Sequence, residues 1–408
     1  MDITHNTSDI DNQDLQVESI DDHLLGKHIA LCVSGGIAAI ETPKLARQLR
    51  RHGARVTAYT TPDALKFVGQ AALEWGTGRE VITHLSGMAE HICMDDLVLV
   101  APATLNTINK VYAGIADNPV TTLVASALGN HTPLLIAPTM HESLYNNPFL
   151  RQNLARASEC NNLTIIAPRI GEHKAKLPHL DTLVAASIRT LSTHPLRGKD
   201  ILITAGPTPV KIDDVRRITN VFSGRLGTLI AQEAHYAGAN VTLLLGKTGL
   251  RPPEYVPTIF HNDYDEYTRN VFDALAKGQD IGIFSAAVAD YSPETVAQGK
   301  IPSGGAITSI PLVPTRKIIN DVRERYPDLY MASFKYQIGV SKENLLAIAQ
   351  QRVAHGSNLV VANRAEDMVG SHHAYIVGEE GVIATPQTKH EIARMLVDSI
   401  GERYEQHQ

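Results

Sequence analysis

A short glycine turn near residue 35 has the composition of a phosphate-binding loop. Ser34, Gly35 and Gly36 come at the end of an apolar, β-forming stretch (29–34) and stand before a helical pattern (41–53). At such a strand–turn–helix junction the backbone N–H groups can point toward an anion, and glycine lets a ligand approach the backbone closely. The turn therefore predicts a site for a phosphate-bearing molecule, although Gly35 and Gly36 would equally serve a simple tight turn.

The sequence around this turn lacks the other features of a dinucleotide site. That fingerprint requires GxGxxG and an acidic residue about 20 positions later, which binds a ribose hydroxyl. Here the second predicted strand (55–61) ends in Thr60 and Thr61. Hydroxyl groups at this place suit a flavin phosphate better than an adenosine ribose, which argues against an NAD-dependent dehydrogenase.

Polar residues also follow the apolar strand predicted at 97–103. Ala103 ends this strand, Thr104 and Asn106 come next, and the sequence Gly-Ile-Ala-Asp-Asn lies further on at 114–118. Ligands of open α/β sheets bind at the carboxyl ends of the strands. Helix caps and turns use the same residue types. The combination with the first turn nevertheless favours a ligand site.

His91 stands just before the same strand, in the sequence Ala-Glu-His-Ile-Cys. Histidine changes protonation near neutral pH and can act as a base or a proton shuttle. Most histidines are surface residues or satisfied core residues, and the chain has 18 of them. Its place beside the strand that leads to Thr104 makes His91 a candidate catalytic residue.

The composition restricts the class of protein. Hydrophobic residues make up 43% and charged residues 20% of the chain, as in soluble globular proteins, and 408 residues suit two domains. A net charge of −6 argues against nucleic acid as a partner. No apolar run approaches the roughly 20 residues that span a bilayer, so no membrane partner is expected. The three cysteines form no CxxC pair, which favours a reducing compartment, and we expect the cytoplasm.

Apolar strands alternate with helical patterns along the chain. The expected strands are 29–34, 55–61, 97–103, 134–140, 163–169, 201–206, 240–246, 281–291 and 358–363, and the expected helices include 41–53, 178–192 and 228–238. This alternation predicts parallel sheets covered by helices on both faces, the doubly wound α/β class. A polar stretch with Pro195 and Gly198 interrupts the pattern, so we expect domains at 28–193 and 194–408. Residues 1–27 are polar and lack the apolar segment of a signal peptide, and we expect a disordered tail.

The second half begins with its own anion-binding pattern. Gly206, Pro207 and Thr208 follow a predicted strand, and Ser223 and Gly224 open a predicted helix. Backbone amides at both places can face an anion. Helix caps and turns remain the ordinary alternative for each of these residues.

Several long motifs resemble two enzyme families. SGGIAAIE (34–41), the histidine before a strand, APATLNT (101–107), GIADN (114–118) and PTMHESLYNNP (138–148) resemble the flavin-containing cysteine decarboxylases. The segments 204–227, 286–300 and 359–363 resemble the phosphopantothenate–cysteine ligases. From about residue 27 the whole chain therefore resembles the bifunctional decarboxylase–ligase proteins of coenzyme A biosynthesis, in a variant that is similar to archaeal members.

The resemblance implies a flavodoxin-like FMN domain followed by a Rossmann-like ligase domain. The ligase step would join cysteine to 4′-phosphopantothenate through an acyl-cytidylate, with CTP and Mg²⁺. The decarboxylase step would use FMN to oxidise the thiol side of the product, lose CO2 and yield 4′-phosphopantetheine. The implied assembly is a homo-oligomer, a dodecamer of decarboxylase trimers and ligase dimers, with FMN bound between the subunits of a trimer.

The resemblance also implies roles for individual residues. It places FMN at Ser34, Gly35, Gly36, Thr60, Ala103, Thr104 and Asn106. It assigns catalysis to His91 in decarboxylation and to Asn220 and Lys300 in ligation. It places the nucleotide at Gly206, Pro207, Thr208, Ser223, Gly224, Ser285, Ala286, Asp290, Lys300, Phe334 and Asn363. It does not identify the residues that bind Mg²⁺.

The decarboxylase half departs from its family at two places. His141 stands where the family has an asparagine that binds the substrate carboxylate, and histidine can still bind a carboxylate. The loop 171–180 lacks the cysteine that serves the family as a proton donor, and Cys160 lies too far upstream to replace it. Lys174 and Lys176 in this loop would anchor a phosphate or deliver a proton, or they are simply solvated. A regulatory flavoprotein with an inactive decarboxylase half is therefore an alternative.

The ligase half also departs from its family. A lysine-rich patch after Lys300 is replaced by residues 302–305, and an aspartate is replaced by Arg364. Two nucleotide-contacting lysines correspond to Gln351 and His355. We expect CTP as the co-substrate, with ATP or UTP as alternatives.

Overall fold

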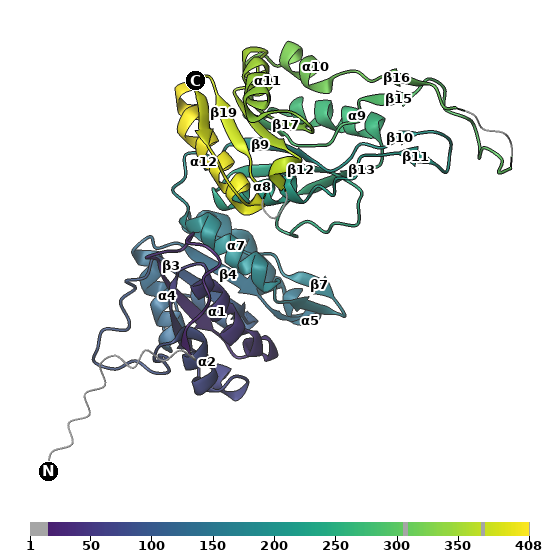
Figure 1. The fold of residues 1–408 in the computed structure, drawn as a ribbon. Helices are drawn as coiled ribbons and strands as arrows, with labels where there is room; N and C mark the ends of the chain where they lie inside the picture. The colour runs from purple at the N-terminus through teal and green to yellow at the C-terminus, as the bar shows by residue number, and fades with distance from the viewer. Residues whose placement is uncertain (1–14, 305–308, 369–371, 408) are drawn as a thin grey trace. The chain divides into compact units, whose positions relative to one another are not determined.

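The computed structural model describes residues 15–304, 309–368 and 372–407, and the chain divides into two compact units between Leu191 and Ser192 (Figure 1). Both units are α/β, and each contains a sheet whose strands are connected by helices. The predicted α/β class is confirmed. No helix among the described residues is both long enough and apolar enough to cross a membrane.

The first unit is built on a sheet of five parallel strands in the order β2-β1-β3-β4-β6. These strands are β1 (His28–Val33), β2 (Arg55–Thr60), β3 (Leu97–Ala103), β4 (Leu134–Pro138) and β6 (Leu163–Ile165). The chain first moves outward from β1 to β2 and then returns to the other side of β1 through β3. The carboxyl ends of β1 and β3 therefore flank the point where the strand order reverses, which is where flavodoxin-like sheets bind ligands.

Helices cover both faces of this sheet. The helices are α1 (Thr42–Arg51), α2 (Gln70–Thr77), α3 (Leu105–Tyr112), α4 (Pro119–Gly129), α6 (Pro148–Ala155) and α7 (Leu180–Leu191). Ile108 of α3, Leu123 of α4 and Leu150 of α6 pack into one buried cluster with alternate residues of the strands. Helices α1 and α7 contact each other, and α7 contacts β3. Because both faces are covered, all seven residues of β3 are buried, which explains its continuous apolar sequence.

A small antiparallel sheet accompanies the main sheet of the first unit. It has the order β5-β8-β7, with β5 (Met140–His141), β7 (Arg169–Gly171) and β8 (Lys174–Lys176). The sequence predicted single strands at 134–140 and 163–169, but the structure breaks both. In the second case β6 ends at Ile165, and Pro168, which has no N–H to donate, stands between it and β7 of the small sheet.

The second unit has an eight-stranded sheet in the order β13-β12-β9-β14-β17-β18-β19-β20. The strands are β9 (Asp200–Ala205), β12 (Asn240–Gly246), β13 (Thr258–His261), β14 (Ile281–Phe284), β17 (Tyr330–Gln337), β18 (Leu359–Arg364), β19 (Tyr375–Gly378) and β20 (Gly381–Ala384). The six strands from β13 to β18 are parallel, and β19 and β20 pair antiparallel. The strand order reverses between β9 and β14, as in Rossmann folds.

Helices cover both faces of the second sheet as well. Helices α8 (Arg225–Tyr236) and α12 (Lys389–His407) pack on one face, where Ile230 and Leu396 join one core cluster. Helices α9 (Tyr264–Leu275), α10 (Ile318–Arg325) and α11 (Lys342–Ala354) pack on the other face. Successive side chains of a strand point to opposite faces of the sheet, so Leu359 and Val360 belong to different core clusters.

A long arm leaves this sheet after β14. The sequence predicted one strand at 281–291, but the strand ends at Phe284 and the chain leads into the arm, which carries the antiparallel pair β15 (Tyr291–Pro293) and β16 (Leu312–Pro314) (Figure 1). Near it lies a second short pair, β10 (Val210–Lys211) and β11 (Arg217–Ile218).

The expectation of a disordered tail is wrong for residues 15–27. Leu24 is completely buried, and the Leu24 amide donates to the carbonyl of His52 at 2.7 Å. The carboxylate of Asp21 contacts Nδ1 of His52 at 2.8 Å, and the side chain of Arg50 donates to the carbonyl of Leu15 at 2.6 Å. A buried leucine and these polar contacts fix the segment against the end of α1. Residues 1–14 lie outside the described residues.

Candidate functional site

The first unit contains a cavity of about 910 Å³ at the carboxyl ends of β1 and β3. Its position is the one that the reversal of the strand order predicts for a ligand, and its volume is in the range of sites for small molecules and cofactors. Apart from Gly35 and Gly36, the apolar part of its wall consists of Ile37, Ala38, Ile40, Pro62, Pro102, Leu105, Met140, Leu144, Ala175 and Leu177. Polar and charged groups form the rest.

The glycine turn after β1 borders this cavity. A Cβ atom on Gly35 would lie 2.4 Å from Cβ of Asp63, so only glycine fits against the turn that follows β2. A Cβ atom on Gly36 would only touch the methyl group of Thr104, at 3.6 Å. Gly35 is therefore required by packing, whereas Gly36 leaves its backbone accessible from the cavity.

Ser34 joins the ends of β1 and β3 from beneath the cavity. Its buried hydroxyl donates to the carbonyl of Pro102 at 2.7 Å and accepts the amide of Thr104 at 2.9 Å. Thr104 in turn caps α3 by accepting the amide of Thr107. The N-terminus of α3, with its positive end of the helix dipole, thereby borders the cavity.

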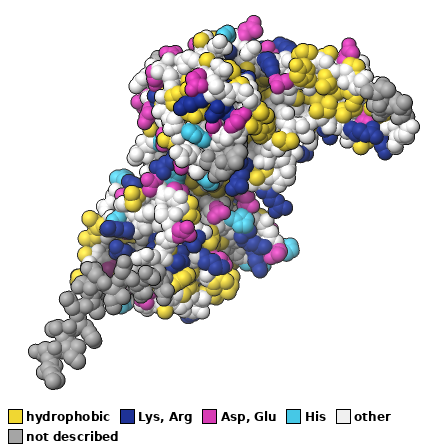
Figure 2. Space-filling model, viewed as in Figure 1, with side chains coloured by type: hydrophobic (Ala, Val, Ile, Leu, Met, Phe, Trp, Pro, Cys, Tyr) yellow, Lys and Arg dark blue, Asp and Glu magenta, His cyan; other side chains and the backbone are white. Residues whose placement is uncertain are grey.

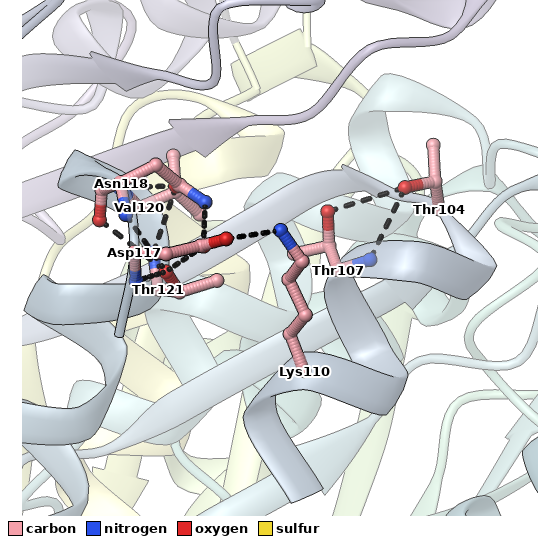
Figure 3. Close-up of polar contacts among 7 residues, drawn as sticks. All are labelled: Thr104, Thr107, Lys110, Asp117, Asn118, Val120 and Thr121. Carbon is pink, nitrogen blue, oxygen red and sulfur yellow. Dashed lines mark hydrogen bonds and ion pairs between the residues drawn. The ribbon is translucent and has the colours of Figure 1, made fainter. Parts of the chain in front are cut away.

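A second helix N-terminus carries a network of polar side chains (Figure 3). Asn118 caps α4 by accepting the amides of Val120 and Thr121, and its own amide group donates to Asp117 at 2.8 Å. Lys110 of α3 donates to the other oxygen of Asp117 at 2.5 Å, and this hydrogen bond lowers the pKa of Asp117. The network joins α3 to the start of α4, and Lys110 and Asp117 both line the cavity.

The small sheet contributes basic side chains to the same cavity. His141, Arg169, Lys174 and Lys176 all line it. Nδ1 of His141 accepts the amide of Ser143 at 3.2 Å and so caps α5 (Glu142–Tyr145). A backbone amide can only donate, so the neutral imidazole carries its proton on Nε2, where it can serve as a donor.

The structure brings together most of the residues expected in the first site. Gly35, Gly36, Thr104, Asn106, His141, Lys174 and Lys176 line the cavity. Ser34, Thr60 and Ala103 are buried residues that do not line it, and the hydroxyl of Thr60 has no hydrogen-bond partner among the described residues. His91 is exposed and lies outside the cavity lining of the single chain. The sequence analysis missed Lys110 and Arg169, since neither stands in a recognisable motif.

In the second unit two glycine turns pack directly against each other. Gly206, after β9, and Gly224, before α8, have positive φ angles of 78° and 85°. A Cβ atom on Gly224 would lie 2.9 Å from the backbone nitrogen of Gly206 and 2.7 Å from Leu245. Both positions therefore require glycine, and the N-terminus of α8 lies at the carboxyl end of β9.

Hydrogen bonds connect the loops that follow β9 and β14. The hydroxyl of Thr208 accepts the amide of Ala289 at 2.9 Å, and the hydroxyl of Ser285 donates to the carbonyl of Thr204 at 2.6 Å. The side chain of Asn220 donates to the carbonyl of Ala287 at 2.9 Å. The expected nucleotide residues of both loops, with Asn220, thus meet where the strand order reverses.

A cluster of charged side chains includes Asp290. Asp290 forms an ion pair with Lys317, and its charge also acts on Lys335 and Arg352. Burial lowers the pKa of Lys335, and the charge of Arg352 lowers it further. One carboxylate is thus in contact with one basic group and within electrostatic influence of two more, so positive charge is in excess here. The sequence analysis missed all three basic residues, because they come from separate segments.

Asp213 connects β10 and β11 to the loop of Lys300. Its carboxylate is 1% exposed and accepts the amides of Val215, Arg216 and Ile301 at 2.8, 2.6 and 3.1 Å. Burial by itself raises the pKa of Asp213, but these hydrogen bonds outweigh it and lower the pKa to about 2. Lys300 precedes one of these donors, and its own side chain is exposed. The sequence analysis did not single out Asp213.

The remaining expected nucleotide residues lie on neighbouring strands. Phe334 belongs to β17 and Asn363 to β18, and both are partly buried. Arg364, which replaces an expected aspartate, forms two hydrogen bonds to Asp367 at 2.7 and 2.8 Å. Within the described parts of the chain, no three His, Cys, Asp or Glu side chains are grouped to hold a metal ion.

Comparison with known proteins gives a consistent result for both halves. A family model described as flavoprotein matches residues 18–192, and one described as the C-terminal domain of DNA/pantothenate metabolism flavoproteins matches residues 196–404. The coenzyme A biosynthesis bifunctional protein CoaBC of Thermococcus kodakarensis is 39% identical, over 92% of this chain and 95% of that protein. The protein of the same name from Methanocaldococcus jannaschii is 33% identical over 92% of this chain and 94% of its own. A crystal structure of the C-terminal domain of a CoaBC protein is 29% identical and covers 52% of this chain and 100% of its own, with a TM-score of 0.43.

Proposed function

Because this chain belongs to the CoaBC family of bifunctional coenzyme A biosynthesis proteins, we propose that it performs two successive reactions of that pathway. Residues 194–408 ligate cysteine to 4′-phosphopantothenate, and residues 28–193 decarboxylate the phosphopantothenoylcysteine that results. The final product is 4′-phosphopantetheine. The reactions take place in the cytoplasm and involve neither nucleic acid nor a membrane.

The observation that carries the decarboxylase assignment is the cavity at the ends of β1 and β3. An FMN molecule needs a site for its phosphate and apolar walls for its ring system. The backbone of Gly35 and Gly36, the N-terminus of α3 and the side chains of Thr104 and Asn106 fit the phosphate, and the apolar wall fits the rings. Ser34, Thr60 and Ala103 support this site from beneath, since they are buried next to its lining.

Bound FMN supplies a reversible two-electron oxidation of the substrate, which makes the loss of CO2 chemically accessible. The residues of this chain bind and orient the substrate. Nε2 of His141 is a hydrogen-bond donor for the carboxylate that leaves as CO2. Lys174 and Lys176 line the same cavity and add positive charge to its wall.

We assign the proton transfer of decarboxylation to His91. Its side chain is exposed in the single chain, and three apolar residues close to it in sequence are exposed as well, Met88 to 83%, Ile92 to 45% and Met94 to 85%. Such a surface suits contact with another copy of the chain. In a trimer, His91 of one subunit would complete the cavity of the next.

The ligase half uses CTP, with Mg²⁺ carried by its phosphates. The turns at 206–208 and 223–224 offer backbone amides, and Ser285, Ala286 and Asp290 belong to the loop that faces them. Phe334 and Asn363 complete the nucleotide site. Lys300 stabilises the charge that develops on the phosphates during acyl-cytidylate formation, and Asn220 positions that intermediate for attack by the amine of cysteine.

The ligase half would form dimers, and together with decarboxylase trimers these give a dodecamer. Hydrophobic side chains are visible along the arm that carries β15 and β16 (Figure 2). Among the residues that follow β14, Tyr291, Val296 and Leu312 are 56%, 52% and 47% exposed. An apolar arm of this kind suits burial against a second ligase unit.

A single assay by mass spectrometry tests both halves. Purified protein with its own flavin receives 4′-phosphopantothenate, cysteine, Mg²⁺ and each of CTP, ATP, UTP and GTP in turn. We expect 4′-phosphopantetheine, with CTP as the supporting nucleotide. If the reaction stops at phosphopantothenoylcysteine, the decarboxylase half is inactive and acts as a regulatory flavoprotein. If no product forms with any nucleotide, the ligase assignment is wrong.

A further inference from the structure

The register of the small sheet places four basic side chains on one of its faces. Arg169 is paired with Lys176, and Lys174 is paired with His141. In an antiparallel sheet, directly opposite residues point to the same face, and so do residues two apart on a strand. Arg169, Lys174, Lys176 and His141 therefore share one face, and all four line the 910 Å³ cavity. We call this set the hairpin face.

The acidic residues of the cavity do not neutralise the hairpin face. Three carboxylates line the cavity, and each has a lysine partner that does not belong to the hairpin face. Glu41 contacts Lys44, Asp63 contacts Lys66 and Asp117 contacts Lys110, with distances of 3.5, 2.6 and 2.5 Å. No acidic residue of the cavity wall is therefore left to pair with the hairpin face.

The hairpin itself supplies a single carboxylate. Glu172 forms an ion pair with Lys176 at 2.7 Å, and the side chain of Glu172 is 77% exposed. In the part of the chain that the structure describes, Arg169 and Lys174 have no carboxylate within ion-pair distance. Arg169 uses its Nε to donate to the carbonyl of Leu177 at 3.0 Å, which leaves its two terminal nitrogens available. The face thus carries a surplus of positive charge, as the blue and cyan side chains near β7 and α5 in Figure 2 illustrate.

A planar guanidinium beside an ammonium group is a suitable pair for a phosphate monoester, because arginine binds two phosphate oxygens at once and lysine adds a point charge. We propose that Arg169, Lys174 and Lys176 bind the phosphate group of phosphopantothenoylcysteine and thereby make the decarboxylase half selective for the phosphorylated substrate. This inference rests on the proposed function and adds the recognised group to it. The phosphate of FMN is the competing occupant, and it is assigned to the glycine turn and α3.

The proposal predicts that removing the charge of Glu172 raises the affinity for the phosphorylated substrate. Its carboxylate competes with a phosphate for Lys176, so Glu172→Gln should tighten binding of the phosphorylated substrate by about 2- to 10-fold. Lys174→Ala and Arg169→Ala should weaken it by roughly 10- to 100-fold, and Arg169→Lys should recover only part of the loss. Arg156→Ala is the matched control, because Arg156 is an exposed basic residue of the same unit that pairs with Glu159 and does not line the cavity.

The experiment compares decarboxylation of phosphopantothenoylcysteine with that of pantothenoylcysteine by the flavin-loaded full chain. For Lys174→Ala we expect a higher KM with the phosphorylated substrate, little change in kcat and unchanged kinetics with the unphosphorylated one. Calorimetry with the products 4′-phosphopantetheine and pantetheine gives the same comparison without turnover. The flavin content of each purified variant is measured by its absorbance and should equal that of the wild type.

Each contrary outcome has a separate meaning. If Lys174→Ala and Glu172→Gln change the KM of the phosphorylated and the unphosphorylated substrate by the same factor, the phosphate assignment is overturned while the decarboxylase function stands. If Lys174→Ala and Arg169→Ala lose their flavin, the hairpin face holds the phosphate of FMN and the proposal is wrong. If the wild type decarboxylates neither substrate, the proposed function fails, and the calorimetric preference for 4′-phosphopantetheine still decides the phosphate site.

Discussion

The hydroxyl of Ser34 is hydrogen bonded to the backbone amide of Thr104, 70 positions later in the chain. The same hydroxyl donates to the carbonyl of Pro102, and it is completely buried. One small side chain therefore connects the glycine turn after β1 to the N-terminus of α3. The two parts of the expected FMN phosphate site are held in position by this connection.

Ser34→Ala should weaken both the fold and the retention of flavin. It leaves the partly buried amide of Thr104 without its acceptor, whereas the carbonyl of Pro102 keeps the backbone amide of Ser34 at 3.3 Å. The loss costs about 1–3 kcal/mol of the free energy of unfolding of the first unit. We expect a lower apparent melting temperature and partial loss of flavin on dialysis. Thr122→Ala is a suitable control, because the buried hydroxyl of Thr122 has no partner among the described residues. Equal effects of the two variants would contradict this explanation.

His91→Asn should abolish the release of CO2 while FMN stays bound, because His91 does not line the cavity proposed for the flavin. If His91 acts on the cavity of another subunit, mixed oligomers of His91→Asn and His141→Ala should recover part of the activity, because His141 lines the cavity and His91 does not. The measurement is the rate of CO2 release before and after the two variants are mixed and reassembled. Full activity of His91→Asn alone would remove His91 from the mechanism.

Lys300→Ala should separate the two activities. Lys300 belongs to the second unit, so its removal should lower the rate of ligation by at least about 100-fold through the loss of charge stabilisation at the phosphates. Decarboxylation of supplied phosphopantothenoylcysteine should be unchanged. Both rates are measured by mass spectrometry on one preparation. Ligation at the wild-type rate would show that the exposed side chain of Lys300 takes no part in it.

Asp213→Asn should loosen the loop of Lys300 and lower the stability of the second unit near neutral pH. The pKa of Asp213 is about 2, below its ordinary value of 3.8. A lowered pKa in the folded state means that the carboxylate stabilises the fold fully above about pH 4 and progressively less as the pH falls toward 2. The variant should therefore be less stable than the wild type near neutral pH, and the difference should shrink as the pH falls.

Thermal unfolding between pH 2 and 7 measures this difference, and the KM of ligation at neutral pH reports on the loop. Asp214→Asn is the matched control, because the carboxylate of Asp214 accepts the exposed amide of Gly299 in this loop, whereas the buried carboxylate of Asp213 accepts three amides. A constant difference between wild type and Asp213→Asn over the whole pH range would contradict the assigned pKa.

The sequence by itself determined the features that depend on short segments. Apolar runs predicted most strands of both sheets, because a strand buried on both faces must be apolar throughout. The glycine turns after β1 and β9 were also predictable, since a turn next to a strand and a helix is a local pattern. The resemblance to two families, which rests on contiguous motifs, is confirmed by the comparisons.

Only the tertiary structure decided how distant segments complete the sites. Arg169 joins the basic face because the register of β7 and β8 aligns it with Lys176, and nothing in the local sequence specifies that register. Asp213 supports the loop of Lys300 through an amide 88 positions away, at Ile301. Charge clusters and buried hydrogen bonds of this kind depend on which elements pack together, and packing is a property of the whole chain rather than of any one segment.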